Sequence, residues 1–269
     1  MENGIKPEPF LKWAGSKRKL LPALEGLIPK SFGTYIEPFL GSASLFFHLA
    51  PTDAYLADAN KDLINTYLAV RDNPELVSRH LSRMRVDREV YYSIRSKRSN
   101  GLYKRAAEFI YLNKTCWNGL YRVNLKGEFN VPYGAPKNSK VFEKENLFGC
   151  SCALSSSSIK LACADYSAVE KIAKKNDFVF LDPPYVTTHS NNGFIEYNEK
   201  IFSWDDQVRL ASMCERLANR GVRVLITNAS HDALRNLYAG FESKEIVRKS
   251  TLASSSKFRR EVKEIAFFA

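Results

Sequence analysis

Residues 178–185 read Phe-Val-Phe-Leu-Asp-Pro-Pro-Tyr, an apolar run that ends in an acid, two prolines and an aromatic ring. A short apolar run rich in β-forming residues predicts a buried strand over 178–181, and prolines cannot continue a sheet ladder. In open α/β sheets, ligands bind beyond the carboxyl ends of the strands. The stretch therefore predicts an α/β fold and puts Asp182 and Tyr185 where chemistry is expected.

The side chains that follow this strand suit an exocyclic aromatic amine as the reacting group. Asp182 and the carbonyl of Pro183 can accept the amine hydrogens as positive charge develops on nitrogen, and proline adds no competing N–H. The ring of Tyr185 offers a face on which a planar base outside its duplex can stack. The structural alternative is a proline turn in which Asp182 caps a helix and Tyr185 only packs.

The composition describes a chain that can bury a sizeable core. It has 269 residues, of which 45% are hydrophobic and 12% aromatic, which favours one large domain or a domain with an insert. No run approaches the roughly 18 apolar residues of a membrane span, and the N-terminus lacks the apolar core of a signal peptide. We therefore expect a cytoplasmic protein with no membrane partner.

Cysteine and histidine usage gives no sign of a disulfide framework or of a metal. The five cysteines are an odd number in a mid-sized chain, which argues against a disulfide framework. Cys150 and Cys152 lack a second ligand pair at metal spacing, and the four histidines are scattered without an HExxH pattern. We expect no metal site.

Positive charge is concentrated in one segment. Residues 69–151 carry 16 Lys and Arg against 8 Asp and Glu, which is +8 of the net charge of +11. An excess of this kind points to a polyanionic partner, although a basic balance alone is also compatible with a solvated surface. A second basic group, Lys257, Arg259, Arg260 and Lys263, is open to the same two interpretations.

The order of elements before this segment follows the logic of nucleotide-like cofactor binding. The predicted elements are a helix at 18–27, a strand at 35–38, a small-residue turn at 39–44, a helix at 45–49 and a strand at 54–57 that ends at Asp58. An acid at that distance from the turn can take ribose hydroxyls. The turn has one glycine and departs from GxGxxG, so an ordinary turn acid is the alternative for Asp58.

The basic segment has the character of an inserted module. Its pattern is helical at first and then becomes a loop crowded with Asn, Gly and Pro. α/β alternation then resumes, with predicted strands at 159–163, 178–181, 222–226, 244–247 and 262–268 and a helix at 205–219.

Taken together, these features resemble the Dam-type DNA adenine-N6 methyltransferases across nearly the whole chain. Five stretches carry the resemblance: FLKWAGSK (10–17), EPFLGSAS (37–44), ADAN (57–60), YLNKTCWNGLYRVNLKGEFNVPYG (111–134) and DPPY (182–185). The last also fits other amino methyltransferases, whereas the long asparagine-rich stretch is far more specific.

The resemblance implies a seven-stranded, Rossmann-like catalytic domain over 1–68 and 152–269 that binds S-adenosyl-L-methionine. It also implies a mostly helical DNA-recognition domain inserted at 69–151. The expected enzyme transfers a methyl group to N6 of a flipped adenine in double-stranded DNA, with GATC as the implied site. It would act in a prokaryotic cell or be encoded by a phage, with no obligate protein partner evident.

The resemblance also implies a set of cofactor residues. Trp13 and Lys17 would border the cofactor, Phe39 and Gly41 approach it, Asp58 bind its ribose and Asp165 lie near its adenine ring, with Asp182 shared by the cofactor and catalytic sites. Packing for Trp13 and a solvated charge for Lys17 are the structural alternatives. One departure is Ala43, where the family usually has a second glycine, since alanine adopts positive φ less freely.

For DNA, the resemblance assigns sequence reading to the asparagine-rich stretch and its surroundings. Trp117 would be the wedge that replaces the flipped base and Asn118 would lie beside its former partner; a buried tryptophan with an asparagine turn is the alternative. Leu120 would contact a thymine methyl, Arg122 a guanine and Lys12 the first guanine of the site. Phosphate contacts or loop hydrogen bonds are expected for Lys114, Asn124 and Asn130, and one phosphate contact is in doubt at Ala135, where some relatives have arginine.

The expected reaction is an in-line methyl transfer with Asp182, Pro183 and Tyr185 as catalytic residues and no covalent enzyme intermediate. Two rivals stay open at this point. One is an amino methyltransferase acting on RNA or on a protein amide, and the other is a non-catalytic DNA-binding relative.

Overall fold

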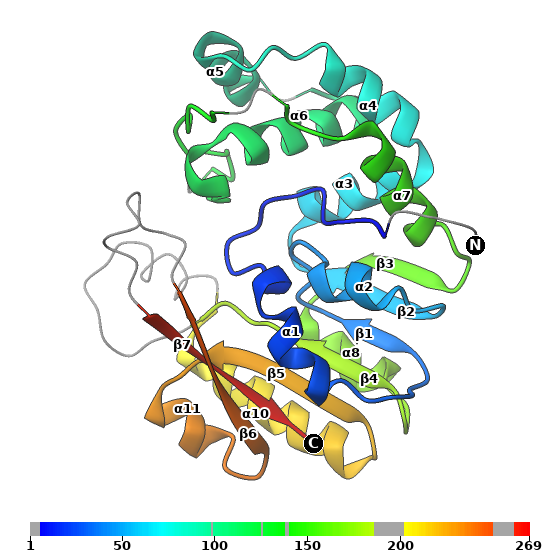
Figure 1. Cartoon of the computed structure of the whole chain (residues 1–269), viewed down its shortest axis with the longest axis vertical. Helices are drawn as coiled ribbons and strands as arrows, with labels where there is room; N and C mark the ends of the chain where they lie inside the picture. The colour runs from blue at the N-terminus through cyan, green and yellow to red at the C-terminus, as the bar shows by residue number, and fades with distance from the viewer. Residues whose placement is uncertain (1–5, 98, 125, 138–139, 186–201, 250–260) are drawn as a thin grey trace. The chain divides into compact units, whose positions relative to one another are not determined.

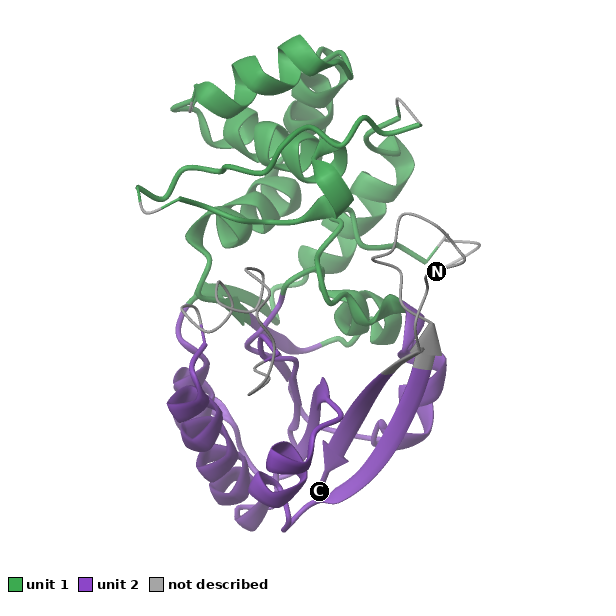
Figure 2. Cartoon of the chain, turned by 90° about the vertical axis from the view of Figure 1, so that its left-hand side faces the viewer, with its two compact units in different colours: residues 1–18, 41–52, 57–163 green, residues 19–40, 53–56, 164–269 purple. Residues whose placement is uncertain are grey.

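The computed structural model describes residues 6–97, 99–124, 126–137, 140–185, 202–249 and 261–269 (Figure 1). Contacts divide the chain into two compact units (Figure 2). Unit 1 comprises Met1–Arg18, Gly41–Thr52 and Ala57–Cys163, and unit 2 comprises Lys19–Leu40, Asp53–Leu56 and Ala164–Ala269. The predicted catalytic domain (1–68 and 152–269) and recognition domain (69–151) divide the chain at other places than these two units, and that division stays a prediction. Their boundaries fall inside helices α3 (Lys61–Asp72) and α7 (Lys144–Leu154).

Within the described ranges, seven strands form one mixed sheet, which confirms the predicted α/β class. The strands are β1 (Tyr35–Glu37), β2 (Ala54–Asp58), β3 (Ile159–Cys163), β4 (Phe178–Leu181), β5 (Arg223–Ala229), β6 (Glu242–Lys249) and β7 (Glu261–Phe268). Their order is β3-β2-β1-β4-β5-β7-β6; β1 is parallel to β2 and β4, β4 is parallel to β5, and β7 is antiparallel to both neighbours. The order reverses between β1 and β4, which is where open α/β sheets bind ligands.

All the predicted strands are present, with ends that differ by a few residues. The helix predicted over 18–27 is instead three short pieces: η1 (Lys17–Lys19), α1 (Leu21–Leu24) and η2 (Glu25–Leu27). Pro22 explains the break between η1 and α1, because proline has no N–H to bond the preceding turn and favours the first positions of a helix.

Unit 1 is mainly helical, and short polar side chains cap three of its described helices. Asn60, Asn73 and Asp87 accept backbone N–H bonds at the starts of α3, α4 (Pro74–Ser82) and α5 (Arg88–Ser96). The longest of these helices, α6 (Leu102–Thr115), packs against α3 and α4. A short helix, α2 (Ser44–Leu49), follows the small-residue turn as predicted.

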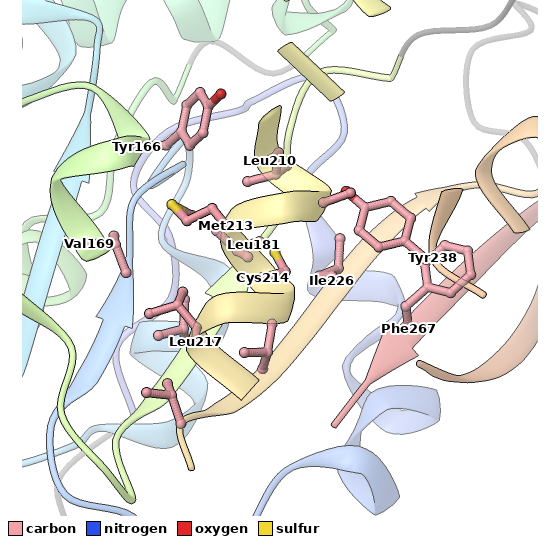
Figure 3. Packing of buried hydrophobic residues seen from close by; sticks show 14 of the residues in the cluster. Tyr166, Val169, Leu181, Leu210, Met213, Cys214, Leu217, Ile226, Tyr238 and Phe267 are labelled. Atoms are coloured by element: carbon pink, nitrogen blue, oxygen red, sulfur yellow. The ribbon is translucent and has the colours of Figure 1, made fainter. Parts of the chain in front are cut away.

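The core of unit 2 joins the sheet to α10 (Trp204–Asn219), which confirms the predicted helix (Figure 3). Leu210 and Leu217 of α10 belong to one buried cluster with Leu181 of β4 and Ile226 of β5. The unit also holds η4 (Tyr166–Ala168), α8 (Val169–Ile172) and α11 (Asp232–Leu237). This packing fixes β4 and β5, and with them the start of the segment that follows β4.

In the part of the chain that the structure describes, no helix combines the length and the apolar character needed to cross a membrane.

Candidate active site and nucleic-acid interface

Asp182 is the first residue after β4, and its carboxylate is held from the neighbouring strand. The Thr227 hydroxyl on β5 donates to Asp182 Oδ1 over 2.9 Å. Thr227 is buried, Pro183 is buried, and Asp182 itself is partly exposed. The carboxylate therefore has a defined direction at the carboxyl end of β4, beside the point where the strand order reverses.

Tyr185 closes the same turn and is anchored through its hydroxyl. It donates to Glu264 Oε2 over 2.5 Å, and the glutamate side chain is 1% exposed. Glu264 lies in β7, paired with Ala229 of β5 on one side and with Ile246 of β6 on the other. The Tyr185 residue is half-buried, so its ring is not a pure packing element.

The end of β1 leads into an aromatic group in unit 2. Phe39 is half-buried and stacks on Tyr166, with ring centroids 5.4 Å apart and 22° between the planes, while Phe202 meets it edge-on. Asp165 is exposed, and its side chain accepts the Ser167 N–H over 3.0 Å to cap η4. Asp165 therefore immediately precedes Tyr166, the ring on which Phe39 stacks.

In unit 1, the small-residue turn is tied to the end of β2. The Gly41 N–H donates to Asp58 Oδ2 over 3.1 Å, and the Asn60 N–H donates to Oδ1 over 2.9 Å. Desolvation raises the pKa of Asp58 to about 6, with the two N–H donors opposing the shift. Ala43 adopts the left-handed conformation that a glycine would favour, with φ of 54°.

Trp13 packs directly on this turn. A Cβ added to Gly41 would lie 2.9 Å from Trp13 Cδ1, so only glycine permits the approach. The other side of the contact is Tyr121, whose ring centroid lies 5.3 Å from that of Trp13. Lys17 is 3% exposed and donates to the Gly15 carbonyl over 2.7 Å, so the interpretation of Lys17 as a solvated charge is wrong.

Several polar side chains of these sites escape sequence reasoning. Ser16, Ser42 and Ser44 form a hydroxyl cluster in unit 1 with oxygen separations of 2.8 to 3.0 Å. The serines that directly follow Gly15 and Gly41, in the stretches 10–17 and 37–44, are a sequence signal that could have indicated this cluster. Thr227 and Glu264 have no such signal, because each lies in an ordinary strand pattern far along the chain.

The asparagine-rich stretch presents Trp117 to solvent. Its side chain is 52% exposed in the 3-10 turn η3 (Trp117–Gly119), which excludes the buried-tryptophan alternative. Asn118 has φ of 54°, and Lys12 packs so closely that a Cβ on Gly119 would lie 2.7 Å from Lys12 Cβ. The Asn113 side chain accepts the Lys12 N–H over 2.7 Å. Lys12 therefore packs against the turn that carries Trp117 within unit 1.

The backbone of residues 132–134 holds the turn that carries Trp117. The Trp117 N–H donates to the Pro132 carbonyl over 2.9 Å, and the Gly134 N–H donates to the Thr115 carbonyl over 2.8 Å. A Cβ on Gly134 would lie 2.4 Å from the Cys116 carbonyl oxygen. The exposed tryptophan thus rests on a tight backbone contact that tolerates no side chain at residue 134.

Arg122 follows the half-buried Leu120 and is exposed. Its Nε donates to Asn130 Oδ1 over 2.8 Å. Asn124 bonds within its own loop, donating to Glu128 Oε2 over 2.9 Å. Of the two interpretations open for Asn124 and Asn130, loop hydrogen bonds are the ones that the structure contains.

Lys114 lies partly buried near Lys12 and Arg18. Desolvation, with the charges of those two neighbours, lowers the pKa of Lys114 to about 8. Ala135 is exposed with φ of 44°, and it brings no charge to this surface.

The second basic group stays untested as a phosphate contact. Lys257, Arg259 and Arg260 lie outside the described residues. Lys263 in β7 is ion-paired with Glu245 of β6 over 2.9 Å. Among the described residues, no group of three or more His, Cys, Asp or Glu is arranged to hold a metal ion.

Family and sequence comparisons relate the chain to DNA methyltransferases. Residues 13–252 match the model of a family described as D12 class N6 adenine-specific DNA methyltransferase. The Type II methyltransferase M1.LlaDCHI of Lactococcus lactis subsp. cremoris is 38% identical over 98% of this chain and 96% of its own length. The Type II methyltransferase M.MjaIII of Methanocaldococcus jannaschii is 36% identical over 96% of each chain. A DNA adenine methylase of Vibrio cholerae is 33% identical over 97% of this chain and 95% of its own.

Proposed function

The chain belongs to the D12 class N6 adenine-specific DNA methyltransferases, and we propose that it methylates a flipped adenine in duplex DNA with S-adenosyl-L-methionine as donor. Membership of this family makes the protein a methyltransferase enzyme that acts on DNA adenine. The observation that carries the proposal is the Asp182 carboxylate, directed by Thr227 at the end of β4. Family membership and this geometry weigh against an RNA or protein amide as substrate, and against a non-catalytic relative.

The chain's own groups suit the methyl transfer. Asp182 and the Pro183 carbonyl accept the N6 hydrogens, which raises electron density on nitrogen as the new N–C bond forms and the methyl–sulfur bond breaks. The N6 proton is released after the transfer, and no bond to the enzyme forms. The half-buried ring of Tyr185 stacks on the base and holds it in line.

The residues proposed for the cofactor fit its chemistry. S-adenosylmethionine supplies an electrophilic methyl group on a positively charged sulfur when bound. Asp58, with a pKa of about 6, is ionised at neutral pH and can accept ribose hydroxyls. We assign the close backbone approach to Gly41, which the Trp13 contact supports.

The remaining cofactor assignments rest on the family likeness and on placement. Phe39 offers a half-buried ring in the aromatic group of unit 2, next to the turn that Asp165 caps. Lys17, fixed on the Gly15 carbonyl, borders the small-residue motif.

For DNA we assign the wedge to Trp117 and the contact with the vacated base to Asn118. The exposure of Trp117 supports this, because a large aromatic side chain held in solvent costs hydrophobic free energy that a base stack can recover. Arg122 and Lys12 would each read a guanine and Leu120 a thymine methyl, which gives GATC as the proposed site. Lys114, Asn124 and Asn130 would support the DNA backbone or the loop.

We propose a cytoplasmic location, supported by prokaryotic relatives whose names describe DNA methyltransferases. In a prokaryotic cell the chromosomal substrate lies in that compartment.

Incubation with radiolabelled S-adenosylmethionine and a GATC-containing plasmid tests the function. We expect label on adenine N6, protection from a nuclease that GATC methylation blocks, and cleavage by one that requires it. Label on adenine with no change at GATC would reject the site but keep the reaction. Label in RNA or protein, or none in any substrate, would reject the reaction.

A further inference from the structure

Two neighbouring strands hold the two ends of the Asp182–Tyr185 turn. Thr227 of β5 donates to the carboxylate of Asp182, and Glu264 of β7 accepts from the hydroxyl of Tyr185. The two bonds come from parts of the chain 45 and 79 residues away from the turn residue that each one holds. Both orienting groups belong to unit 2, as the turn does.

Strand register puts the two orienting side chains on one face of the sheet. Ala229 pairs with Glu264 and Thr227 pairs with Ala266 in the antiparallel ladder of β5 and β7. Directly paired residues share a face and side chains alternate along each strand, so Thr227 and Glu264 are diagonal neighbours. The opposite face carries Ile226, Ile265 and Phe267 into the core cluster of Figure 3.

Glu264 is a charged side chain in a buried position. Its side chain is 1% exposed, and a buried carboxylate costs free energy unless it is hydrogen-bonded. The bond from the Tyr185 hydroxyl meets part of this need and links the buried carboxylate to the site.

We propose that Glu264 and Thr227 are positioning residues for methyl transfer, Glu264 by fixing the position of the Tyr185 ring and Thr227 by fixing the direction of the Asp182 carboxylate. The inference rests on the proposed function of those two residues. Glu264 restricts the swing of the ring about the Cα–Cβ bond, because the hydroxyl at its far end is tied to a strand held between two others. Thr227 donates to one carboxylate oxygen of Asp182 and so fixes the direction of the whole carboxylate.

Four variants separate this role from a purely structural one. Glu264→Ala and Thr227→Val remove the acceptor and the donor, whereas Glu264→Gln and Thr227→Ser keep a hydrogen-bonding oxygen. We expect kcat to fall about 10–100-fold in the first two, as for other orienting groups, with KM for S-adenosylmethionine unchanged and near-normal kcat in the conservative pair. Glu245→Gln is the matched control, since Glu245 lies in the adjoining strand but is exposed and bonds to Arg235 and Ser230.

A double-mutant cycle with Tyr185→Phe tests the contact itself. If Glu264 acts through the tyrosine hydroxyl, the double variant Tyr185→Phe, Glu264→Ala is no slower than the slower single variant. Duplexes with 2-aminopurine at the target position add a spectroscopic readout, because a ring that stacks poorly quenches the flipped base less; we expect brighter emission from Glu264→Ala than from wild type.

The outcomes distinguish failure of the proposed function from failure of the positioning roles. An inactive wild type refutes the proposed function. An active wild type with normal kcat in Glu264→Ala and Thr227→Val, or with fully multiplicative effects in the cycle, overturns the positioning roles. If Glu264→Ala does not fold, kcat of the shape-conserving Thr227→Val still tests the role of Thr227. For Glu264, the test is then Glu264→Gln. If its 2-aminopurine emission is as high and its kcat as low as those of Tyr185→Phe, the proposal is contradicted.

Discussion

Arg122 and Asn130 hold each other through two hydrogen bonds across their loop. Arg122 Nε donates to Asn130 Oδ1 over 2.8 Å, and the Asn130 N–H donates to the Arg122 carbonyl over 3.0 Å. With Nε committed to the loop, the terminal nitrogens of the guanidinium are the pair that the side chain can present to O6 and N7 of a guanine.

Replacing Arg122 by Ala should therefore relax sequence preference at one guanine. We expect a loss of about 1–3 kcal/mol of discrimination there, since that is the usual contribution of a bidentate base contact. The measurement is kcat/KM on duplexes that carry single base-pair changes in the site. Asn124→Ala is the control, and it should weaken all sites alike because Asn124 bonds within its loop. Unchanged discrimination by the Arg122 variant would refute the assignment.

Asp182→Ala should abolish methylation and leave DNA binding largely intact. The substitution removes the acceptor of the N6 hydrogens and touches none of the residues assigned to base reading. Methyl incorporation and gel-shift affinity are measured on the same duplex. Asp205→Ala, an exposed acid in the first turn of α10, is the control and should behave as wild type. Near-normal turnover by the Asp182 variant would contradict the mechanism.

Cofactor affinity should depend on pH through Asp58. The pKa of this carboxyl is raised to about 6, so the acid becomes neutral as the pH falls through 6 and loses its capacity as an anionic acceptor for ribose hydroxyls. We expect the Kd for S-adenosylmethionine to be constant above pH 7 and to rise by up to about tenfold per unit below pH 6. Calorimetric titration checks this. Asp58→Asn should bind weakly with a flat profile, and the same acid slope in that variant would assign the titration to another group.

Gly134→Ala should displace Trp117 and impair base flipping. The added Cβ would lie 2.4 Å from the Cys116 carbonyl oxygen, a backbone atom that cannot move alone. We expect DNA affinity and 2-aminopurine emission to fall together, as in Trp117→Ala. Gly127→Ala is a suitable control for steric effects, because a Cβ there meets nothing within 4 Å, although its φ of 74° adds strain. Normal emission from Gly134→Ala would show that the turn does not present the wedge.

Local patterns were sufficient to predict most of the sheet. The apolar run before Asp182 and the prolines after it predict β4, and the acid after 54–57 marks the end of β2. Both predictions succeed because the buried residues of the strand and the residues of its closing turn are adjacent in the sequence. The helix predicted at 18–27 is interrupted before Pro22, because proline favours the first turn of a new helix. Helix α7 was not predicted, since its sequence has a central Gly149 and weak periodicity.

The site residues divide along the same line. Asp182 and Tyr185 stand out because they follow a strand, whereas Glu264 acquires its partner only through the pairing of β7 between β5 and β6. The exposure of Trp117 could not be predicted from its own segment either, since aromatic residues are mostly packed. Contacts over tens of residues depend on register, which the pattern of one segment does not contain.

Helix α2 has an alanine in the left-handed conformation at each end, and glycine at these two positions should act differently. Ala43 has φ of 54° and is fully buried, whereas Ala50 has φ of 48° and is exposed. A left-handed alanine costs roughly 1–2 kcal/mol, which glycine relieves, while glycine loses more backbone entropy on folding, about 0.5–1 kcal/mol. At residue 43 a buried methyl worth about 0.8 kcal/mol is also lost.

We therefore expect Ala50→Gly to stabilise the protein by about 0.5–1 kcal/mol and Ala43→Gly to change its stability by less than about 1 kcal/mol. Urea unfolding with an unchanged m value measures both. Ala57→Gly, at a buried position in β2 without positive φ, is the control and should destabilise because no strain is relieved. Cofactor affinity should survive in Ala43→Gly, since the turn already has the conformation that glycine favours. A destabilised Ala50→Gly, or a marked loss of cofactor binding in Ala43→Gly, would mean that the methyl groups and not the backbone conformation govern this turn.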